Sequence, residues 1–276
     1  MNSLSNNKVW KDRLNKIKTE VEEIHIPEFS HNQNSISQDE EWCEVYVNGK
    51  NKRIRLHDYG KIYEITGLYE KLFYEKLKCC SPSVVVNLLE DIATNFGEDP
   101  NEFKVLDIGA GNGMVADELD NIGVDSVIGI DILPEAKKAT SRDRPEIYED
   151  YLVTNLADMP KKHEIKLREE DFNCLTTVAA LGFSDIPPIA FLRALDFIET
   201  PGWLAFNIKE NFLHEDDTSG FCRLIRQMNH EKITQIQCYR RYQHRISITG
   251  RPLYYVAIIA KKLKTIPNTL LNEWKQ

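Results

Sequence analysis

The sequence predicts an α/β fold, a doubly wound and mostly parallel sheet of seven strands with a C-terminal antiparallel hairpin, preceded by an N-terminal helix and β-hairpin extension. From residue 103 onward, strand patterns alternate with helix patterns, which is typical of a parallel sheet covered by helices. These strands are apolar at successive positions, as expected when helices cover both faces. The last two strand patterns, 236–249 and 253–262, are joined so tightly that they must pair antiparallel.

Composition limits the classes of protein that the chain can be. With 276 residues, of which 42% are hydrophobic and 28% charged, it can bury the core of one domain plus an extension. Its net charge of −8 disfavours nucleic acid as a partner, because phosphate binding needs a basic surface. The six cysteines form no Cys-x-x-Cys pair, and no signal sequence and no run of roughly 18–20 apolar residues is present. We therefore expect a cytoplasmic protein with no metal site and no membrane partner.

The first 80 residues are expected to form the extension. Apolar residues at helical spacing predict an amphipathic helix over 7–24, and the polar stretch 31–40 is typical of a linker. Alternating apolar residues on both sides of Asn48-Gly49 predict a β-hairpin with a loop longer than two residues. The aromatic residues within 59–74 indicate either a lid over a ligand or a helix face packed on the sheet, and both alternatives stay open.

Residues 81–276 are expected to form the sheet domain. Its first helix starts at Ser81-Pro82, because proline is favoured in the first helical turn. The remaining elements follow in chain order. Strands are expected within 103–111, 125–133, 148–156, 172–181, 202–208, 236–249 and 253–262, and helices within 114–122, 134–143, 186–195 and 219–231.

A glycine-rich turn after the first of these strands is the sharpest signal in the sequence. Gly109, Gly111 and Gly113 leave a strand and open a helix, so the chain can turn tightly and a ligand can lie against bare backbone. Asp131 follows 18 residues after Gly113, at the end of the next strand, where its carboxylate can accept hydrogen bonds from two ribose hydroxyls. Together the turn and the acid predict a nucleoside site.

The spacing of the glycines differs from that of dinucleotide-binding proteins. Met114 occupies the position where the dinucleotide fingerprint has its third glycine, and no Lys-Ser/Thr pair follows to make a phosphate-binding loop. The Gly-x-Gly-x-Gly spacing, with Asp107 two residues ahead, instead resembles the class I S-adenosylmethionine-dependent methyltransferases. The resemblance covers residues 103–263, and the order of strands with its terminal antiparallel hairpin is similar to that fold.

The resemblance implies S-adenosyl-L-methionine as cofactor and S-adenosyl-L-homocysteine as product. It places the glycine turn under the methionine part, Asp107 at the amino group, Asp131 at the ribose and Ile132 on the adenine. At the adenine edge the family usually has an acid, whereas this chain has Asn155-Leu156, with Asp158 as an alternative. The implied cofactor-binding residues are Asp107, Gly109, Ala110, Gly111, Asn112, Gly113, Asp131, Ile132, Asn155, Leu156, Val178 and Ala179, of which the last two border the transferable methyl together with Ala180.

Simpler roles stay open for three of these residues. Asp107 can instead satisfy donors at the end of its strand, Asp131 can cap a helix, and Asn155 can form a turn.

The candidate catalytic residues lie outside the core strands. Asp185 precedes Ile186-Pro187-Pro188, which is similar to the Asp/Asn-Pro-Pro-aromatic motif of nucleic-acid amino-methyltransferases but has an extra isoleucine and lacks the aromatic residue. This segment starts a helix, with Asp185 lining a pocket as the alternative. His214, in a polar loop, and His244, among arginines, are the other candidates. The sequence alone does not identify an obligatory base, because alignment of two reactants supplies roughly 7–11 kcal/mol, more than one general base does.

The acceptor is less determined than the cofactor. Residues 223–252 hold seven basic residues against one acid, which would attract an anionic acceptor to Arg241 and Arg245 unless these arginines pair with acids elsewhere. Tyr63 and Tyr69 are the other candidate substrate-binding residues. We therefore expect methyl transfer to N or O of a small-molecule or peptide acceptor. A non-catalytic cofactor-binding partner module and a nicotinamide-dependent oxidoreductase stay open as alternatives, as does a homodimer through the 7–24 helix.

Overall fold

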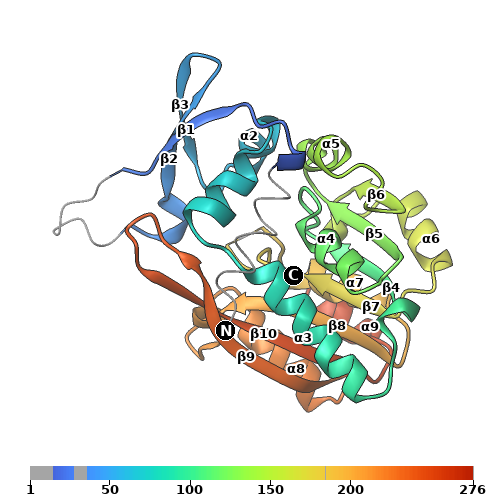
Figure 1. Cartoon of the computed structure of the whole chain (residues 1–276). Helices are drawn as coiled ribbons and strands as arrows, with labels where there is room; N and C mark the ends of the chain where they lie inside the picture. Colours follow the sequence, from blue (N-terminus) through green and yellow to red (C-terminus); the bar gives the residue numbers. More distant parts are fainter. Residues whose placement is uncertain (1–14, 28–35, 184, 276) are drawn as a thin grey trace.

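The computed structural model of the chain describes residues 15–27, 36–183 and 185–275. Its main sheet has seven strands in the order β6-β5-β4-β7-β8-β10-β9, as Figure 1 shows. All neighbours pair parallel except β10, which pairs antiparallel with β8 and β9. This confirms the predicted architecture. The strands are β4 (Lys104–Ile108), β5 (Ser126–Asp131), β6 (Asp150–Val153), β7 (Cys174–Thr177), β8 (Gly202–Lys209), β9 (Thr234–Ile246) and β10 (Pro252–Lys262).

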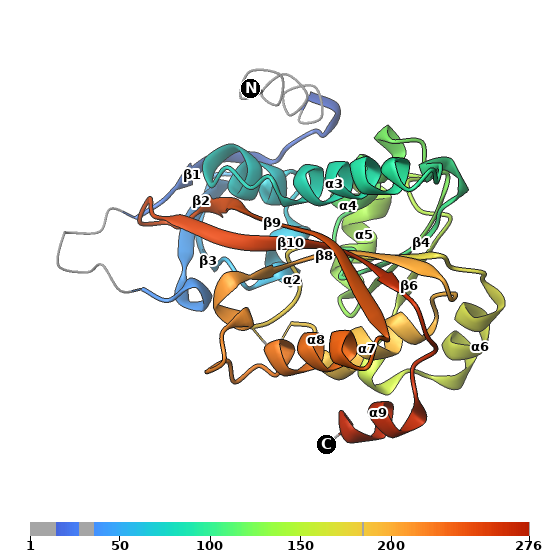
Figure 2. The same ribbon diagram turned by 90° about the horizontal axis from the view of Figure 1, so that it is seen from below.

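Helices cover both faces of this sheet (Figure 2). One layer contains α3 (Ser81–Asn95), α4 (Met114–Asn121) and α5 (Pro134–Asp143), and the other contains α6 (Lys161–Glu169), α7 (Pro188–Asp196), α8 (Phe221–His230) and α9 (Asn268–Glu273). Successive residues of a strand point to opposite faces, so Val105 joins the apolar cluster under the first layer while Leu106 joins the cluster under the second. Both faces are therefore apolar along each strand. Short 3₁₀ turns complete the domain at η3 (Pro100–Glu102), η4 (Leu156–Asp158) and η5 (Glu210–Leu213).

The extension forms a second, antiparallel sheet in the order β1-β2-β3. Its strands are β1 (Val21–His25), β2 (Trp42–Val47) and β3 (Lys50–Arg55), and the 3₁₀ turn η1 (Gln38–Glu40) precedes β2. The strands are followed by α2 (Tyr59–Glu64) and by η2 (Glu70–Lys76), a π-helix.

The predicted helix over 7–24 is wrong at its C-terminal end, and its first part lies outside the described residues. Val21 and Ile24 are buried in β1, three positions apart, because a register shift between Val21 and Glu23 inserts an extra residue. A β-bulge of this kind gives a strand the three-residue spacing of a helix. The pattern was therefore ambiguous in the sequence alone.

The predicted hairpin is confirmed, but its loop is shorter than expected. β2 ends at Val47 and β3 begins at Lys50, which leaves Asn48 and Gly49 as the turn. Both have positive φ, 50° and 72°, the backbone that a two-residue hairpin turn requires and that Asn-Gly favours.

The extension packs against the sheet domain through its own apolar cluster. That cluster includes Met114 of α4 and Ile248 of the β9–β10 link. The long β9–β10 hairpin reaches toward the N-terminal sheet (Figure 1), where Arg245 Nη2 donates to Glu41 Oε2 at 2.5 Å between two buried side chains. The extension is thus held over the carboxyl ends of the parallel strands.

Candidate functional site

A first cavity of about 450 Å³ opens at the carboxyl ends of β6, β5, β4 and β7. Ligands of open α/β sheets bind in this crevice, and the volume is that of a small-molecule site. The strand ends and the start of α7 contribute one side, and residues 57–69 of the extension contribute the other. Its lining includes the predicted residues Gly109, Asp131, Ile132, Asn155, Leu156, Val178 and Ala179.

The glycine turn has the backbone that its sequence predicts. Gly109, Gly111 and Gly113 have φ of 69°, 55° and 89°, which side chains rarely tolerate. A Cβ on Gly109 would lie 2.6 Å from Cβ of Ala180, and one on Gly111 would lie 2.5 Å from Oη of Tyr63. The bare backbone at Gly109 and Gly111 therefore admits close protein side chains.

Asp131 combines a structural role with spare acceptor capacity. Its Oδ2 accepts from the N–H of Gly111 and its Oδ1 from the N–H of Leu133, both at 2.9 Å. Burial raises the pKa of Asp131, and these backbone donors act in the opposite direction. Each carboxylate oxygen has two lone-pair sites, so each can accept one more hydrogen bond from a ligand in the cavity.

Three further residues set the chemistry of the cavity wall near the ends of β5 and β6. Ile132 is 57% exposed, although it follows a buried strand, and so presents an apolar surface to the cavity. Thr154 Oγ1 is buried on the wall and has no hydrogen-bond partner among the described residues. Asn155 Oδ1 accepts from the N–H of Ala157 at 2.9 Å, which forms the expected turn, while its amide nitrogen remains able to donate. A flat apolar ring with polar edges fits these groups.

Asp107 does not reach the cavity, contrary to the expectation. It is fully buried, where its Oδ2 accepts from the hydroxyl of Tyr148 and its Oδ1 from the hydroxyl of Thr176, both at 2.7 Å. Burial raises the pKa of Asp107 to about 7, and the two hydroxyl donors counteract part of that rise. Its partners are strand and loop side chains, so it supports the glycine turn from below.

The other predicted residues of the turn also lie off the cavity. Ala110, Gly111, Asn112 and Gly113 are not among the residues that line it. Asn112 is buried and its Nδ2 donates to Glu70 Oε1 at 2.7 Å. Gly113 is the N-cap of α4.

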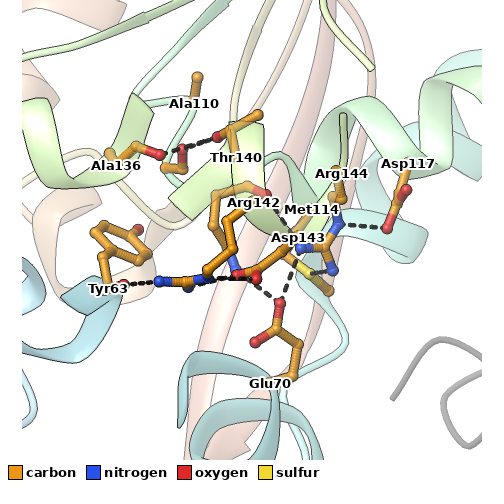
Figure 3. A network of polar contacts seen from close by, with 12 residues as sticks. Tyr63, Glu70, Ala110, Met114, Asp117, Ala136, Thr140, Arg142, Asp143 and Arg144 are labelled. Carbon is orange, nitrogen blue, oxygen red and sulfur yellow. Dashed lines mark hydrogen bonds and ion pairs between the residues drawn. The ribbon is translucent and has the colours of Figure 1, made fainter. Parts of the chain in front are cut away.

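A buried ion-pair network ties this turn to the extension (Figure 3). The Arg144 guanidinium contacts Glu70 Oε1 at 2.8 Å and Asp117 Oδ2 at 2.6 Å, and it also donates to the carbonyl of Asn112. Nearby, Arg142 Nη1 donates to the carbonyl of Tyr63 at 3.1 Å. The network therefore joins η2, α2, α4 and α5 around the glycine turn.

An aromatic lid, which we define as Tyr59, Tyr63, Tyr69 and Phe73, covers the cavity from the extension. Its neighbouring rings lie 4.8 to 6.2 Å apart between centroids. Tyr59, Tyr63 and Tyr69 line the first cavity. The rings pack on one another, three of them line the cavity, and Tyr63 also belongs to the apolar cluster of the sheet that contains Val105, so the run has features of both alternatives.

A second cavity, of about 30 Å³, lies beside the first. The two cavities adjoin at what we call the junction, the five residues that line both of them: His57, Tyr59, Tyr69, Ala179 and Asp185. The second cavity is also lined by His244 and Arg245.

The junction of the cavities holds an acid and a strained backbone. Desolvation by the surrounding walls, together with the Asp131 carboxylate, raises the pKa of Asp185 to about 6. Ala179 has φ of 59°, and its N–H donates to Asn207 Oδ1 at 2.6 Å. Such backbone strain in a non-glycine residue clusters at functional sites.

The remaining predicted residues differ in their outcome. His244 and Arg245 come to the second cavity, although the charge of Arg245 is neutralised by Glu41. Arg241 lies away from both cavities and pairs with Glu210 at 2.5 Å. His214 is exposed after η5 and lines neither cavity. Arg241 was predicted to attract an anionic acceptor unless it pairs with an acid, and the structure shows that it pairs with an acid.

Sequence reasoning missed several lining residues. His57 and Thr154 carried no recognisable motif, and Gln38 lies in the stretch that we expected to be a linker. Burial and Arg245 lower the pKa of His57 to about 4, so this ring is neutral at physiological pH. The aromatic run was the one signal that could have placed the extension beside the ligand.

Two properties of the described residues bear on the class of site. In that part of the chain, no three His, Cys, Asp or Glu side chains gather as ligands for a metal ion. No helix there combines the length and the apolar composition that crossing a bilayer requires.

Comparison with known proteins gives one family. Residues 84–251 match a family described as a methyltransferase domain. No curated protein matches the chain.

Several solved structures are similar to the chain at low identity. A Thermoplasma acidophilum protein has a TM-score of 0.47 and 14% identity, covering 70% of this chain and 94% of its own. The magnesium protoporphyrin IX methyltransferase of Synechocystis, solved with its cofactor bound, has a TM-score of 0.45 and 13% identity, with coverages of 66% and 79%. A ribosomal protein L11 methylase of Lactobacillus delbrueckii has a TM-score of 0.45 and 18% identity, with coverages of 65% and 77%.

Proposed function

The chain belongs to the class I S-adenosylmethionine-dependent methyltransferases, and from this membership we propose that it methylates a nitrogen or oxygen of a small molecule whose reacting group meets the methyl at the junction of the two cavities. The membership supports methyl transfer over the nicotinamide-dependent oxidoreductase, and the labelling experiment below distinguishes it from a non-catalytic partner module. The observation that carries the proposal is the junction of the two cavities at Asp185 and Ala179.

The first cavity fits the cofactor by its residues. S-adenosylmethionine supplies a methyl group on a positively charged sulfur, and this sulfur is the leaving group when S-adenosylhomocysteine forms. Asp131 would accept from the ribose hydroxyls, Ile132 would pack on the adenine, and Thr154 and Asn155 would bond to its polar edge. The exposed Ile132 and the unpartnered Thr154 hydroxyl support this assignment.

The protein's main contribution to the reaction is alignment. Holding a nucleophile in line with the methyl supplies roughly 7–11 kcal/mol, and this depends on walls that do not move. The aromatic lid covers one side of the junction, and the Val178–Ala180 segment, held by Asn207, forms the other. Closing the junction also excludes water from the reacting atoms.

The charges around the second cavity support a neutral or basic acceptor group over an anion. Glu41 compensates Arg245, and Asp185 adds a carboxylate at the junction. With its pKa near 6, Asp185 is ionised at neutral pH and can accept a proton from an attacking N–H or O–H group. The small volume of the cavity supports a small molecule over a peptide segment.

The test uses cofactor labelled in its methyl group, incubated with the protein and with separated small-molecule, protein and RNA fractions of a cell extract. We expect label in the small-molecule fraction, and a large loss of it in Asp185→Asn but not in Asp216→Asn, an exposed acid of the loop after η5. Label found only in protein or RNA would overturn the small-molecule acceptor. Absence of label from every fraction, with cofactor bound, would overturn the methyl transfer.

A further inference from the structure

His244 occupies an unusual position in β9. In the pairing of β9 with β10, Arg245 lies opposite Leu253 and Gln243 lies opposite Tyr254, so His244 is an extra residue in its strand. Successive side chains of a regular strand point to opposite faces, but this bulge lets His244 and Arg245 both be buried. The bulge thereby turns the imidazole toward the second cavity, which it lines.

A chain of hydrogen bonds runs from the junction to this imidazole. The N–H of Ala179 donates to Asn207 Oδ1, and so the amide nitrogen of Asn207 faces Tyr242 Oη at 2.6 Å and must donate to it. Tyr242 Oη lies 2.6 Å from Ser81 Oγ, which in turn lies 2.6 Å from His244 Nδ1.

The direction of this chain fixes the tautomer of His244. Tyr242 has one hydrogen, and because its oxygen accepts from Asn207, that hydrogen goes to Ser81. Ser81 then donates its own hydrogen to Nδ1 of His244 at 2.6 Å, while Cys79 Sγ lies 3.8 Å from the same nitrogen, too far to compete with that bond. The opposite direction would give Tyr242 two incoming hydrogens and leave its own without an acceptor among the described residues. Nδ1 is therefore an acceptor, and the ring hydrogen lies on Nε2.

The imidazole is neutral where it lies. Burial and the neighbouring Arg245 lower the pKa of His244 well below its usual range. A neutral ring with an acceptor at Nδ1 presents one donor, and none of the bonds between the described residues uses Nε2. His244 is thus a hydrogen-bond donor toward the cavity and not the base that the sequence suggested.

A matching acceptor stands on the same wall. Gln38 lines the second cavity, and its Nε2 donates to Tyr255 Oη at 3.1 Å. Its Oε1 is buried and has no partner in the described part of the chain. The ring of Tyr255 lies 4.1 Å from the ring of His244, so Gln38 and His244 flank one tyrosine. An orphaned buried acceptor costs free energy unless a ligand satisfies it.

We propose that the second cavity recognises the methyl acceptor through a small, planar, neutral group that carries a hydrogen-bond acceptor beside an N–H or O–H donor, such as a carboxamide or lactam. His244 Nε2–H donates to the acceptor atom and Gln38 Oε1 accepts from the donor atom. A volume of about 30 Å³ leaves room for a group of a few heavy atoms. This inference rests on the proposed function and names the acceptor chemistry of the same site.

The experiment follows the histidine nitrogens by NMR. The full chain, with ¹⁵N-labelled histidine and saturating S-adenosylhomocysteine, is titrated with acetamide, and in parallel with acetate, which lacks the donor and is charged. We expect His244 to carry its hydrogen on Nε2 and acetamide to shift that resonance while acetate binds roughly tenfold more weakly or not at all. A hydrogen on Nδ1, a doubly protonated ring, or equal binding of both probes would overturn the proposal.

Two variants test the chain itself. In Asn207→Asp the carboxylate can only accept when ionised, so Tyr242, Ser81 and His244 must each reverse their donation, and the ring hydrogen moves to Nδ1. This removes the donor from the cavity, and acetamide affinity falls about five- to tenfold. Tyr242→Phe interrupts the chain and gives a smaller loss, whereas Tyr239→Phe, 74% exposed on the same strand, leaves tautomer and affinity unchanged. If the tautomer of His244 stays the same in both Asn207→Asp and Tyr242→Phe, that result would contradict the inference.

Calorimetry of S-adenosylhomocysteine separates this inference from the proposed function. If the wild-type chain fails to bind it, the cofactor site fails and the proposed function fails with it. If S-adenosylhomocysteine binds but the His244 ring hydrogen lies on Nδ1, the ring is doubly protonated, or acetamide and acetate bind equally, the acceptor chemistry alone is wrong.

Discussion

Asp131 already bonds to two backbone N–H groups, and its value for a ligand lies in the lone pairs that remain. We expect Asp131→Asn to weaken S-adenosylhomocysteine binding by about 1.5–3 kcal/mol, the contribution of hydrogen bonds to a charged group. Isothermal calorimetry measures the affinity, and urea unfolding at the same pH separates any loss of stability. Asp158→Asn is the matched control, because Asp158 is exposed after β6 and does not line the cavity. Equal affinities of the two variants would refute the ribose role.

The raised pKa of Asp185 gives the reaction a pH dependence of known sign. When the pH falls below the Asp185 pKa of about 6, the carboxyl is protonated and can neither accept a proton from the attacking group nor attract a basic group. We therefore expect kcat/KM for the acceptor found by the labelling experiment to fall as the pH drops through about 6. Loss of one general base costs about 10²–10⁴-fold, so Asp185→Asn should show that loss and no longer show the acidic limb. An unchanged limb in the variant would assign it to another group.

The carboxylates also show which residue positions the sequence could predict. The position of Asp131 and Ile132 on the cavity wall was predictable because a strand end in a parallel sheet fixes where the next residues point. Asp107 was not, because Tyr148 and Thr176, which satisfy it, are 41 and 69 residues away in the chain. A distant partner of this kind has no local pattern. The same holds for Glu41, whose pairing with Arg245 removed the expected positive charge.

Arg144 connects the glycine turn to the extension through hydrogen bonds and an ion pair. Its side chain is 5% exposed, and it faces Glu70, which is buried in η2. Removing one member of a buried pair leaves the other charge uncompensated, so we expect Arg144→Met to lower the free energy of unfolding by about 3–5 kcal/mol, measured in urea. Arg223→Met is the control, since the pair of Arg223 with Glu273 is 65% and 48% exposed and should change stability by no more than about 1 kcal/mol.

The double variant Glu70→Gln/Arg144→Met tests the reason for this cost. If the cost comes from a stranded carboxylate, neutralising Glu70 restores part of the stability that Arg144→Met loses. Additive losses would mean that the two side chains do not act as a pair.

Two bulges explain which elements the sequence did not predict correctly. The parallel strands were predictable from continuous apolar runs, because a regular strand covered on both faces has no other pattern. β1 and the end of β9 were not, since an extra residue changes the spacing of Val21 and Ile24 and brings His244 and Arg245 to one side. The order of the sheet followed from the family resemblance, and register shifts within single strands leave that order intact.

Across the whole molecule, basic side chains that are close together in the sequence pair with acidic side chains from other parts of the chain. The basic run that the sequence placed at 223–252 is divided among separate acids, for example Arg226 with Glu215 and Arg241 with Glu210. A locally positive sequence therefore does not give a positive cavity, and the acidic groups Asp131 and Asp185 dominate the field where the cofactor and the acceptor would meet. Such a field favours the positively charged sulfonium over an anion.

The whole molecule also decides whether the predicted boundary between residues 80 and 81 separates two units that function alone. The extension contributes His57, Tyr59, Tyr63 and Tyr69 to the first cavity, and the apolar cluster of its sheet includes Met114 of the other part. A chain that begins at Ser81 would lose one side of the cavity and expose this apolar surface to water. We expect it to bind S-adenosylhomocysteine at least tenfold more weakly than the full chain, by calorimetry, and to lose solubility. Adding residues 1–80 as a separate chain tests whether contact alone restores the site. Wild-type affinity in the shortened chain would show that strand ends suffice for the cofactor, and that the extension serves only the acceptor.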